Sequence, residues 1–147
     1  MPERAHPQRP LPVDVKPTGY GDETAFHARI DVTAGWDRYY RKWIRSWDSP
    51  SPDELIIRDE YILARGNAVE FYWQTRLPVR QSERTAIIQG NQGWATLEVP
   101  PDCKVRIDRL PLAEGKEHNR IAIYQAGSQG VLEVIVSLNA IPVAAWN

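Results

Sequence analysis

Apolar and polar residues alternate along most of the chain from Ala25 onward, which is the period of a half-buried β-strand. The first alternating segment covers residues 26–32, with Phe26 and Ile30 among its apolar positions. The second covers 54–63, and the clearest covers 68–79. Each of these segments is therefore predicted to be a strand with one buried face.

Turn residues separate the strand segments. Residues 86–89 and 94–99 flank the polar stretch 90–93 and predict a hairpin. Residues 120–125 and 131–138, joined through 126–130, predict a second hairpin that closes the domain. With a short strand at Val105 and Ile107, the pattern predicts an all-β, antiparallel β-sandwich of about eight strands over residues 25–147.

The first 24 residues have a different character. They contain five prolines and almost no periodicity, which predicts a Pro-rich extended arm over 1–24. They also lack the continuous apolar stretch of a signal peptide, so the sequence points to no particular compartment.

Composition narrows the function. Eighteen basic against nineteen acidic residues give a net charge of −1, so we expect neither nucleic acid nor a membrane as a partner. Cys103 is the only cysteine and has no visible catalytic base. The three histidines are scattered and form no metal-ligand motif. The sequence therefore predicts no metal, no cofactor and no catalytic residue.

The richest chemistry lies between Trp36 and Trp47. Aromatic residues at 36, 39, 40, 43 and 47 have helical spacing. As a strand, the same segment places Tyr39, Arg41, Trp43, Arg45 and Trp47 on one face, and periodicity alone does not decide between the two. Such a face could stack on sugar rings and neutralise an acidic polymer, or it could pack against a neighbouring layer.

Asp59 is the one charged residue on the apolar face of its predicted strand. It shares that face with Leu55, Ile57, Tyr61 and Leu63. A buried carboxylate needs a partner or a raised pKa, so Asp59 is either part of a structural ion pair or a catalytic group.

Several motifs together resemble the β-domain of heparinase II/III-type polysaccharide lyases. The resemblance spans about residues 25–140. The motifs are Arg29-Ile-Asp-Val-Thr-Ala-Gly-Trp36, Trp43-Ile-Arg-Ser-Trp47, Asp53-Glu-Leu-Ile-Ile-Arg-Asp-Glu-Tyr-Ile-Leu63, Phe71-Tyr-Trp-Gln-Thr75, Gly93-Trp-Ala-Thr-Leu97 and Leu132-Glu-Val-Ile-Val136.

The resemblance implies an enzyme with a helical toroid followed by a β-sandwich. Such enzymes cleave acidic polysaccharides by β-elimination, with tyrosine and histidine as acid and base. This chain has no toroid and no His-x-His-x-Asp stretch, and it has Gln74 and Thr75 where some members have a histidine. No catalytic residue is carried over.

The resemblance also implies a strand over about 38–47 that pairs with 54–63. If the turn centres between Pro50 and Ser51, Trp43 lies opposite Arg58, and Lys42 lies opposite Asp59 as a structural charge pair. Tyr40 and Ile44 would then face inward. Tyr39, Arg41, Trp43, Arg45 and Trp47 would face outward as a glycan or domain contact.

The sequence thus predicts a non-catalytic β-domain of a heparinase-like lyase. Its expected partner is an acidic polysaccharide or a missing helical toroid domain, and an uncovered docking face would favour self-association. The alternatives are a free-standing carbohydrate-binding module and a small enzyme whose polar groups converge in a pocket.

Overall fold

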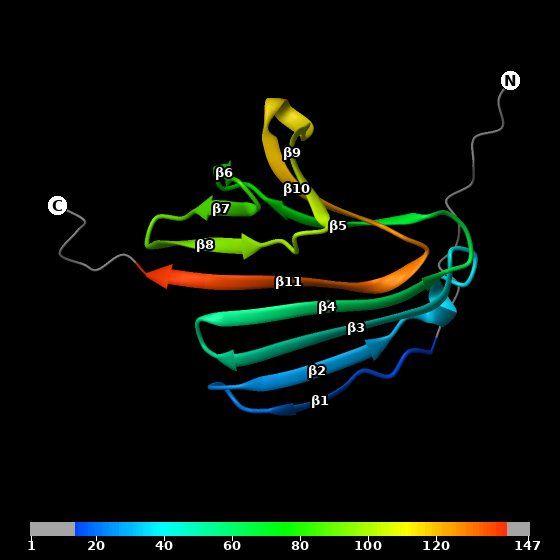
Figure 1. The fold of residues 1–147 in the computed structure, drawn as a ribbon. Coiled ribbons are helices and arrows are strands. Elements are labelled where there is room, and N and C mark those ends of the chain that lie inside the picture. Colours follow the sequence, from blue (N-terminus) through cyan, green and yellow to red (C-terminus); the bar gives the residue numbers. More distant parts are fainter. Residues whose placement is uncertain (1–13, 141–147) are drawn as a thin grey trace, which may run out of the picture.

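The fold is an all-β sandwich, seen in a computed structural model that describes residues 14–140 (Figure 1). The larger layer is an antiparallel sheet of eight strands in the order β1-β2-β3-β4-β11-β8-β7-β6. Its strands are β1 Thr18–Gly21, β2 Phe26–Asp31, β3 Tyr40–Ser51, β4 Glu54–Leu63, β6 Val79–Ser82, β7 Thr85–Gln89, β8 Gly93–Glu98 and β11 Gln129–Ala140.

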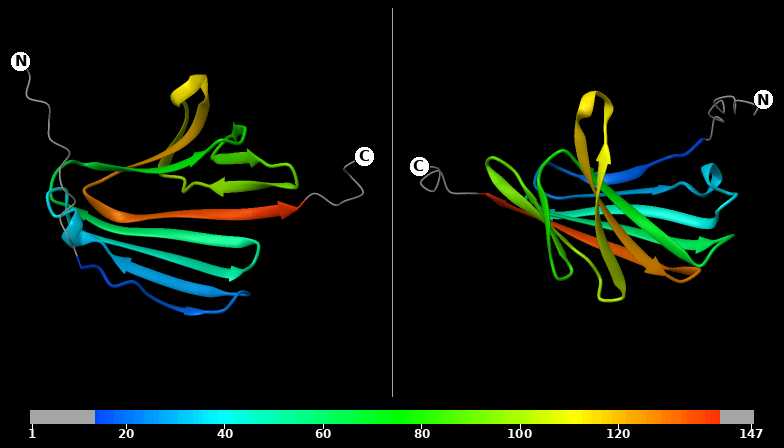
Figure 2. Two further views of the ribbon diagram at one scale, coloured as in Figure 1. Left: turned by 180° about the vertical axis from the view of Figure 1, so that it is seen from behind. Right: turned by 90° about the horizontal axis from the view of Figure 1, so that it is seen from above.

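The smaller layer has three antiparallel strands in the order β5-β10-β9. They are β5 Ala68–Thr75, β9 Cys103–Pro111 and β10 Glu117–Ala126. A 3₁₀ turn, η2 Ala113–Gly115, joins β9 to β10, and this hairpin projects beyond the rest of the sandwich (Figure 2). A second 3₁₀ turn, η1 Thr33–Gly35, precedes β3.

The core fills the space between the two sheets. Alternate residues of β4, β11 and β8 face alternate residues of β5 and β10, as the sequence periodicity predicts. The most deeply buried of the large side chains are Leu97, Ile121, Ile123, Leu132 and Val134. On β4, Leu55, Ile57, Tyr61 and Leu63 do lie on the inward face, and Asp59 lies there with them.

Two expectations about the strands need correction. The described residues form eleven strands rather than about eight, in part because the run predicted over 68–79 ends as β5 at Thr75, and Val79 begins β6 in the other sheet. Residues 120–125 and 131–138 do not form a hairpin with one another. Strand β10 pairs with β5 and β9, while β11 pairs with β4 and β8, so residues 126–130 form a corner between the sheets.

The corner has a specific backbone requirement. Gly127 has φ of 122° and donates its backbone N–H to the Asn67 carbonyl at 2.6 Å. This positive φ is readily adopted only by glycine. The chain can therefore leave one sheet and enter the other within a few residues.

Part of the predicted N-terminal arm belongs to the sheet. Residues 18–21 form β1, which pairs with β2 from Thr18 opposite Arg29 to Gly21 opposite Phe26. Residues 1–13 of the predicted arm and residues 141–147 of the predicted domain lie outside the described residues.

Candidate functional site

The segment with the richest chemistry begins as a turn and continues as a strand. Residues 33–35 form η1, Trp36 to Tyr39 continue the turn, and β3 starts at Tyr40. This explains why the sequence showed both helical and strand spacing. The aromatic residues at 36, 39 and 40 lie in or beside the turn, while 43 and 47 lie in the strand.

The predicted register of β3 against β4 is wrong. Trp43 lies opposite Tyr61, and Arg45 lies opposite Asp59. Strand β3 runs on through Pro50 to Ser51, and the Ser49 hydroxyl donates to carbonyls of the turn at Ser51 and Glu54. The turn therefore comes later than expected, which shifts the pairing by three residues.

An odd shift reverses the faces of a strand. Trp43, Arg45 and Trp47 consequently lie on the inner face with Asp59, although they were expected to face outward. Ile44 lies on the outer face, although it was expected inside. Tyr40 faces inward as expected, because an irregularity between Tyr40 and Lys42 inserts Arg41 as an exposed bulge residue.

Asp59 is the centre of the inner-face polar group. Its carboxylate accepts hydrogen bonds from Arg45 Nε and Nη2, each at 2.7 Å, and from Trp43 Nε1 at 2.9 Å. The Arg45 guanidinium also lies over the Trp43 ring at 5.6 Å and the Phe71 ring at 5.3 Å. Asp59 is only 7% exposed, so this fork satisfies the carboxylate that the sequence left unpaired.

The predicted pair of Lys42 with Asp59 is not formed. Lys42 lies on the outer face, and its Nζ donates to Glu60 Oε1 at 2.6 Å. This hydrogen bond, with the positive charge of Lys42, lowers the pKa of the Glu60 carboxyl. The shifted register explains the exchange of partners, because it brings Arg45 to the position expected of Lys42.

Three aromatic side chains contact one another beside the Arg45–Asp59 pair, and the exposed Tyr39 lies on the turn next to them. We call these four residues the aromatic rim: Trp36, Tyr39, Tyr40 and Trp43. Tyr40 and Trp43 stack at 4.8 Å between ring centroids, and Trp36 meets Trp43 edge-on at 5.5 Å. Trp36 is 48% exposed and Tyr39 is 55% exposed. The rim thus has a half-buried base and an outer layer that is open to solvent.

The half-buried base has a perturbed titration. Burial raises the pKa of the Tyr40 phenol, and the negative charge of Asp59 raises it further, while Arg45 opposes the shift. Tyr40 is therefore a neutral hydroxyl at physiological pH, suited to hydrogen bonding and stacking.

Of the five residues predicted as an outward contact surface, only two are exposed to solvent. Tyr39 and Arg41 are exposed, but Trp43, Arg45 and Trp47 are partly covered and turned inward. Trp36 was in the same aromatic stretch but not among the five. No spacing rule pairs residue 36 with residue 43; the two rings meet because the turn before β3 folds Trp36 back toward the start of that strand.

The other chemical groups are dispersed over the described residues. His27 bonds Asp48 on the outer face, and His118 shares a hydrogen bond with Gln74 on β10 and β5. Burial raises the pKa of the Cys103 thiol to about 11, with a further contribution from Asp102. Within residues 14–140, no three His, Cys, Asp or Glu side chains are grouped to hold a metal ion.

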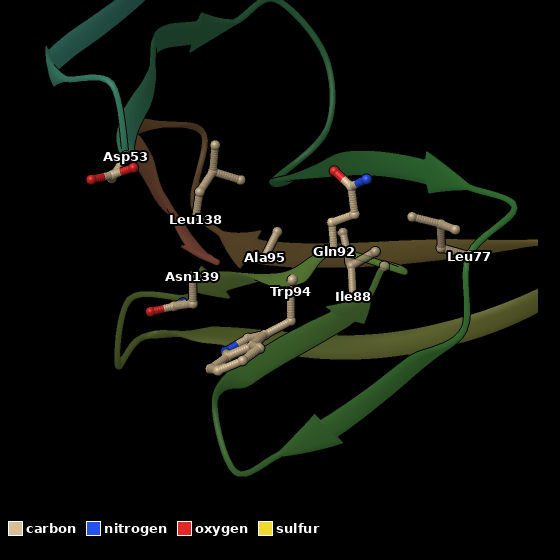
Figure 3. A pocket seen from close by; sticks show the side chains of 10 residues that line it. Asp53, Leu77, Ile88, Gln92, Trp94, Ala95, Leu138 and Asn139 are labelled. Carbon is tan, nitrogen blue, oxygen red and sulfur yellow. The ribbon is translucent and has the colours of Figure 1, made fainter. Parts of the chain in front are cut away.

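An apolar pocket of about 390 Å³ lies at the end of the sandwich opposite the aromatic rim, where β11 meets the β7–β8 hairpin (Figure 3). Leu77, Ile88, Ala95 and Leu138 form its apolar lining, with Trp94 and Asn139 at its edge. Leu77 and Leu138 are 44% and 54% exposed.

Among residues 14–140, no helix has the length and hydropathy to cross a membrane.

Comparison with known proteins places this fold. No protein-family model matches the chain, and no curated protein matches it. Solved structures do match: a mutant of the heparan sulfate lyase HepC from Pedobacter heparinus superposes with a TM-score of 0.65 at 8% identity. The match covers 86% of this chain and 22% of that one. The chain has the fold of a heparinase III domain.

A second heparinase III, the BT4657 gene product, gives the same result. Its TM-score is 0.60 at 13% identity, over 90% of this chain and 22% of that one. This chain therefore spans about a fifth of the heparinase structures it matches. That share is consistent with the C-terminal β-domain that the sequence motifs resemble.

Proposed function

We propose that the chain is a non-catalytic β-domain of a heparinase-like polysaccharide lyase and that its aromatic rim contacts an acidic polysaccharide. The observation that carries the proposal is the match of almost the whole chain to about a fifth of heparinase III. The absence of the histidine motif from the sequence supports a contact role over a catalytic one.

The geometry of the rim suits a sugar chain. Trp36 and Tyr39 expose their rings, and a pyranose ring stacks on such faces through its C–H groups. Arg38 and Arg41 are exposed on the same turn and bulge, where they can attract sulfate or carboxylate groups. Arg45 does not serve in this way, because Asp59 already neutralises it.

The second candidate is that the rim holds a helical catalytic domain. An aromatic surface with a half-buried base is also what a domain interface exposes when its partner is missing. A free-standing carbohydrate-binding module would also bind glycan through the rim. The coding sequence upstream of this chain distinguishes a lyase domain from a free-standing module, because a helical toroid encoded there indicates a lyase.

The test is to measure, by calorimetry at two salt concentrations, the binding of heparin, heparan sulfate and alginate oligosaccharides. We expect weak binding that falls as salt rises, and a loss of about fivefold in Trp36→Ala or Tyr39→Ala. Tyr20→Ala is the matched control, because Tyr20 is 76% exposed but lies on β1, away from the rim. Binding that is equal in the rim variants and the control would contradict the glycan contact.

A further inference from the structure

The outer face of β2, β3 and β4 carries a polar depression that the aromatic rim does not use. Its volume is about 240 Å³. It lies on the face opposite Asp59, because the lining residues alternate with the inward-facing positions of the three strands. The lining residues are His27, Arg29, Ile44, Ser46, Asp48, Arg58 and Glu60.

Two arginines flank a serine across this depression. Arg29 lies opposite Ser46 on the next strand, and Ser46 lies opposite Arg58 on the strand after that. Neighbouring strands are about 4.8 Å apart, so the two arginine backbones are separated by about 10 Å with Ser46 between them. Both long side chains can reach a small group held above the Ser46 hydroxyl.

The nearby carboxylates form no ion pair with these arginines, although the charges of Arg29 and Arg58 contribute to lowering the pKa of Glu60, and the charge of Arg29 contributes to lowering that of Asp31. Three of them have other partners: Glu60 has Lys42 at 2.6 Å, Asp48 has His27 at 2.5 Å, and Asp31 has the Thr33 hydroxyl at 2.6 Å. Over residues 14–140, neither Arg29 nor Arg58 forms an ion pair within 4.0 Å. Two guanidinium groups are thus left with donors to spare.

Glu133 is a further carboxylate that could compete. It lies on β11 directly opposite Arg58, on the same outer face, and it forms no ion pair with Arg58 within 4.0 Å. Its charge weakens the local positive potential without occupying the guanidinium. Removing that charge should therefore strengthen the attraction of the two arginines for an anion.

We propose that Arg29, Ser46 and Arg58 form a binding site for one tetrahedral oxyanion, sulfate or phosphate, either free or carried on a larger molecule. Guanidinium groups bind oxyanions through paired N–H donors, and the serine hydroxyl supplies a donor between them. A tetrahedral anion can accept from both sides and from below at once, whereas a carboxylate has only two oxygens to share. This site is separate from the aromatic rim and does not depend on the function proposed for it.

The test is a nuclear magnetic resonance titration with sodium sulfate at constant ionic strength. The readouts are the backbone amides of residues 29, 46 and 58 and the Nε–H signals of both arginines. We expect saturable shifts in the millimolar range. Arg29→Gln and Arg58→Gln each weaken binding about tenfold, and Glu133→Gln tightens it a few-fold.

Arg109→Gln is the matched control, since it removes the same charge from an exposed position on β9. Phosphate should behave as sulfate does, and acetate should bind more weakly. A heparin tetrasaccharide that displaces sulfate identifies a glycan-borne group as a ligand, and one that leaves the sulfate signals unchanged identifies the free ion. Trp36→Ala should leave the sulfate affinity unchanged even if it abolishes glycan binding at the rim.

Shifts that grow linearly without saturation would overturn the proposal, because they report bulk salt and not a site. Equal weakening by Arg109→Gln and Arg58→Gln would also overturn it, because only net charge would then matter.

Discussion

Arg45 holds both oxygens of the Asp59 carboxylate, each at 2.7 Å, from the neighbouring strand of the same sheet. The two residues lie directly opposite each other on the inner face, where the Arg45 guanidinium lies over the rings of Trp43 and Phe71. This planar fork fixes the position of β3 against β4, because a one-residue slip would move the two groups to opposite faces.

Asp59→Asn should lower the free energy of unfolding by about 3 kcal/mol, because it leaves the partly buried Arg45 charge without its partner. Equilibrium unfolding in urea measures the loss. Glu60→Gln is the control, since it removes the acid of an exposed pair one residue away and should change stability little. Equal losses in the two variants would show that the fork does not stabilise the fold.

Trp43→Phe should cost about 1 kcal/mol, because the ring is kept but the indole N–H to Asp59 is lost. Trp43→Ala should cost about 3 kcal/mol or more, since it also removes the support of the rim. Thermal unfolding followed by circular dichroism checks both. A Trp43→Ala variant as stable as the wild type would mean that Trp43 is a surface residue after all.

Cys103 should resist alkylation by iodoacetamide at pH 9 while the chain is folded, because burial raises its pKa to about 11. Mass spectrometry of the folded and urea-unfolded chain measures the difference. The raised pKa also means that the folded state favours the neutral thiol. Its contribution to stability is therefore complete below about pH 9 and is lost as the pH rises through 11.

The Cys103→Ala variant isolates this effect from the tyrosines, whose pKa values are also raised. Its stability should decline less steeply than that of the wild type between pH 9 and pH 11. A decline of the same slope would assign the whole pH dependence to other groups.

The chain alone should not cleave heparin, heparan sulfate or alginate by β-elimination. The ultraviolet absorbance of the unsaturated product is the measurement, and a heat-treated sample is the control. Turnover well above that control would refute the non-catalytic role and would direct attention to polar groups that the sequence motifs do not include.

The apolar pocket at Leu77 and Leu138 should promote self-association at high concentration, since both leucines are exposed. Sedimentation velocity over a range of concentrations measures it. Leu138→Gln should shift the chain toward monomer, and Trp36→Ala serves as the control at the other end of the sandwich. A chain that stays monomeric throughout would contradict this prediction.

The sequence predicts the strand faces well where alternation is uninterrupted. On β4, the inward positions from Leu55 to Leu63 follow directly from period two, and Asp59 could be recognised as a buried acid from its position alone. The structure match covers 86% to 90% of the chain, in agreement with the span of the motifs.

The sequence does not predict which face of a strand a residue occupies where that depends on a single backbone irregularity. The bulge at Arg41 and the continuation of β3 through Pro50 each alter the pairing, and neither has a pattern in the side chains. Proline is also a poor indicator here, because Pro50 suggested a turn centred between Pro50 and Ser51, whereas β3 continues through Pro50 to Ser51. The partner of Asp59 therefore followed from the register and not from residue type.

The sequence did not predict the corner at Gly127 either. A glycine between two apolar runs predicts a hairpin turn, and only the pairing partners show that the two strands belong to different layers. Local sequence describes the turn but not which sheet the next strand joins.

The place of β11 between β4 and β8 has a consequence for the order in which the chain is made. Strands β1 to β4 and strands β6 to β8 are two separate ribbons until β11 is inserted between them. During synthesis, both ribbons leave the ribosome with an unpaired inner edge, and each waits for residues 129–140 to emerge. Unpaired edges recruit strands from other chains, so the newly made protein is most exposed to aggregation just before β11 arrives.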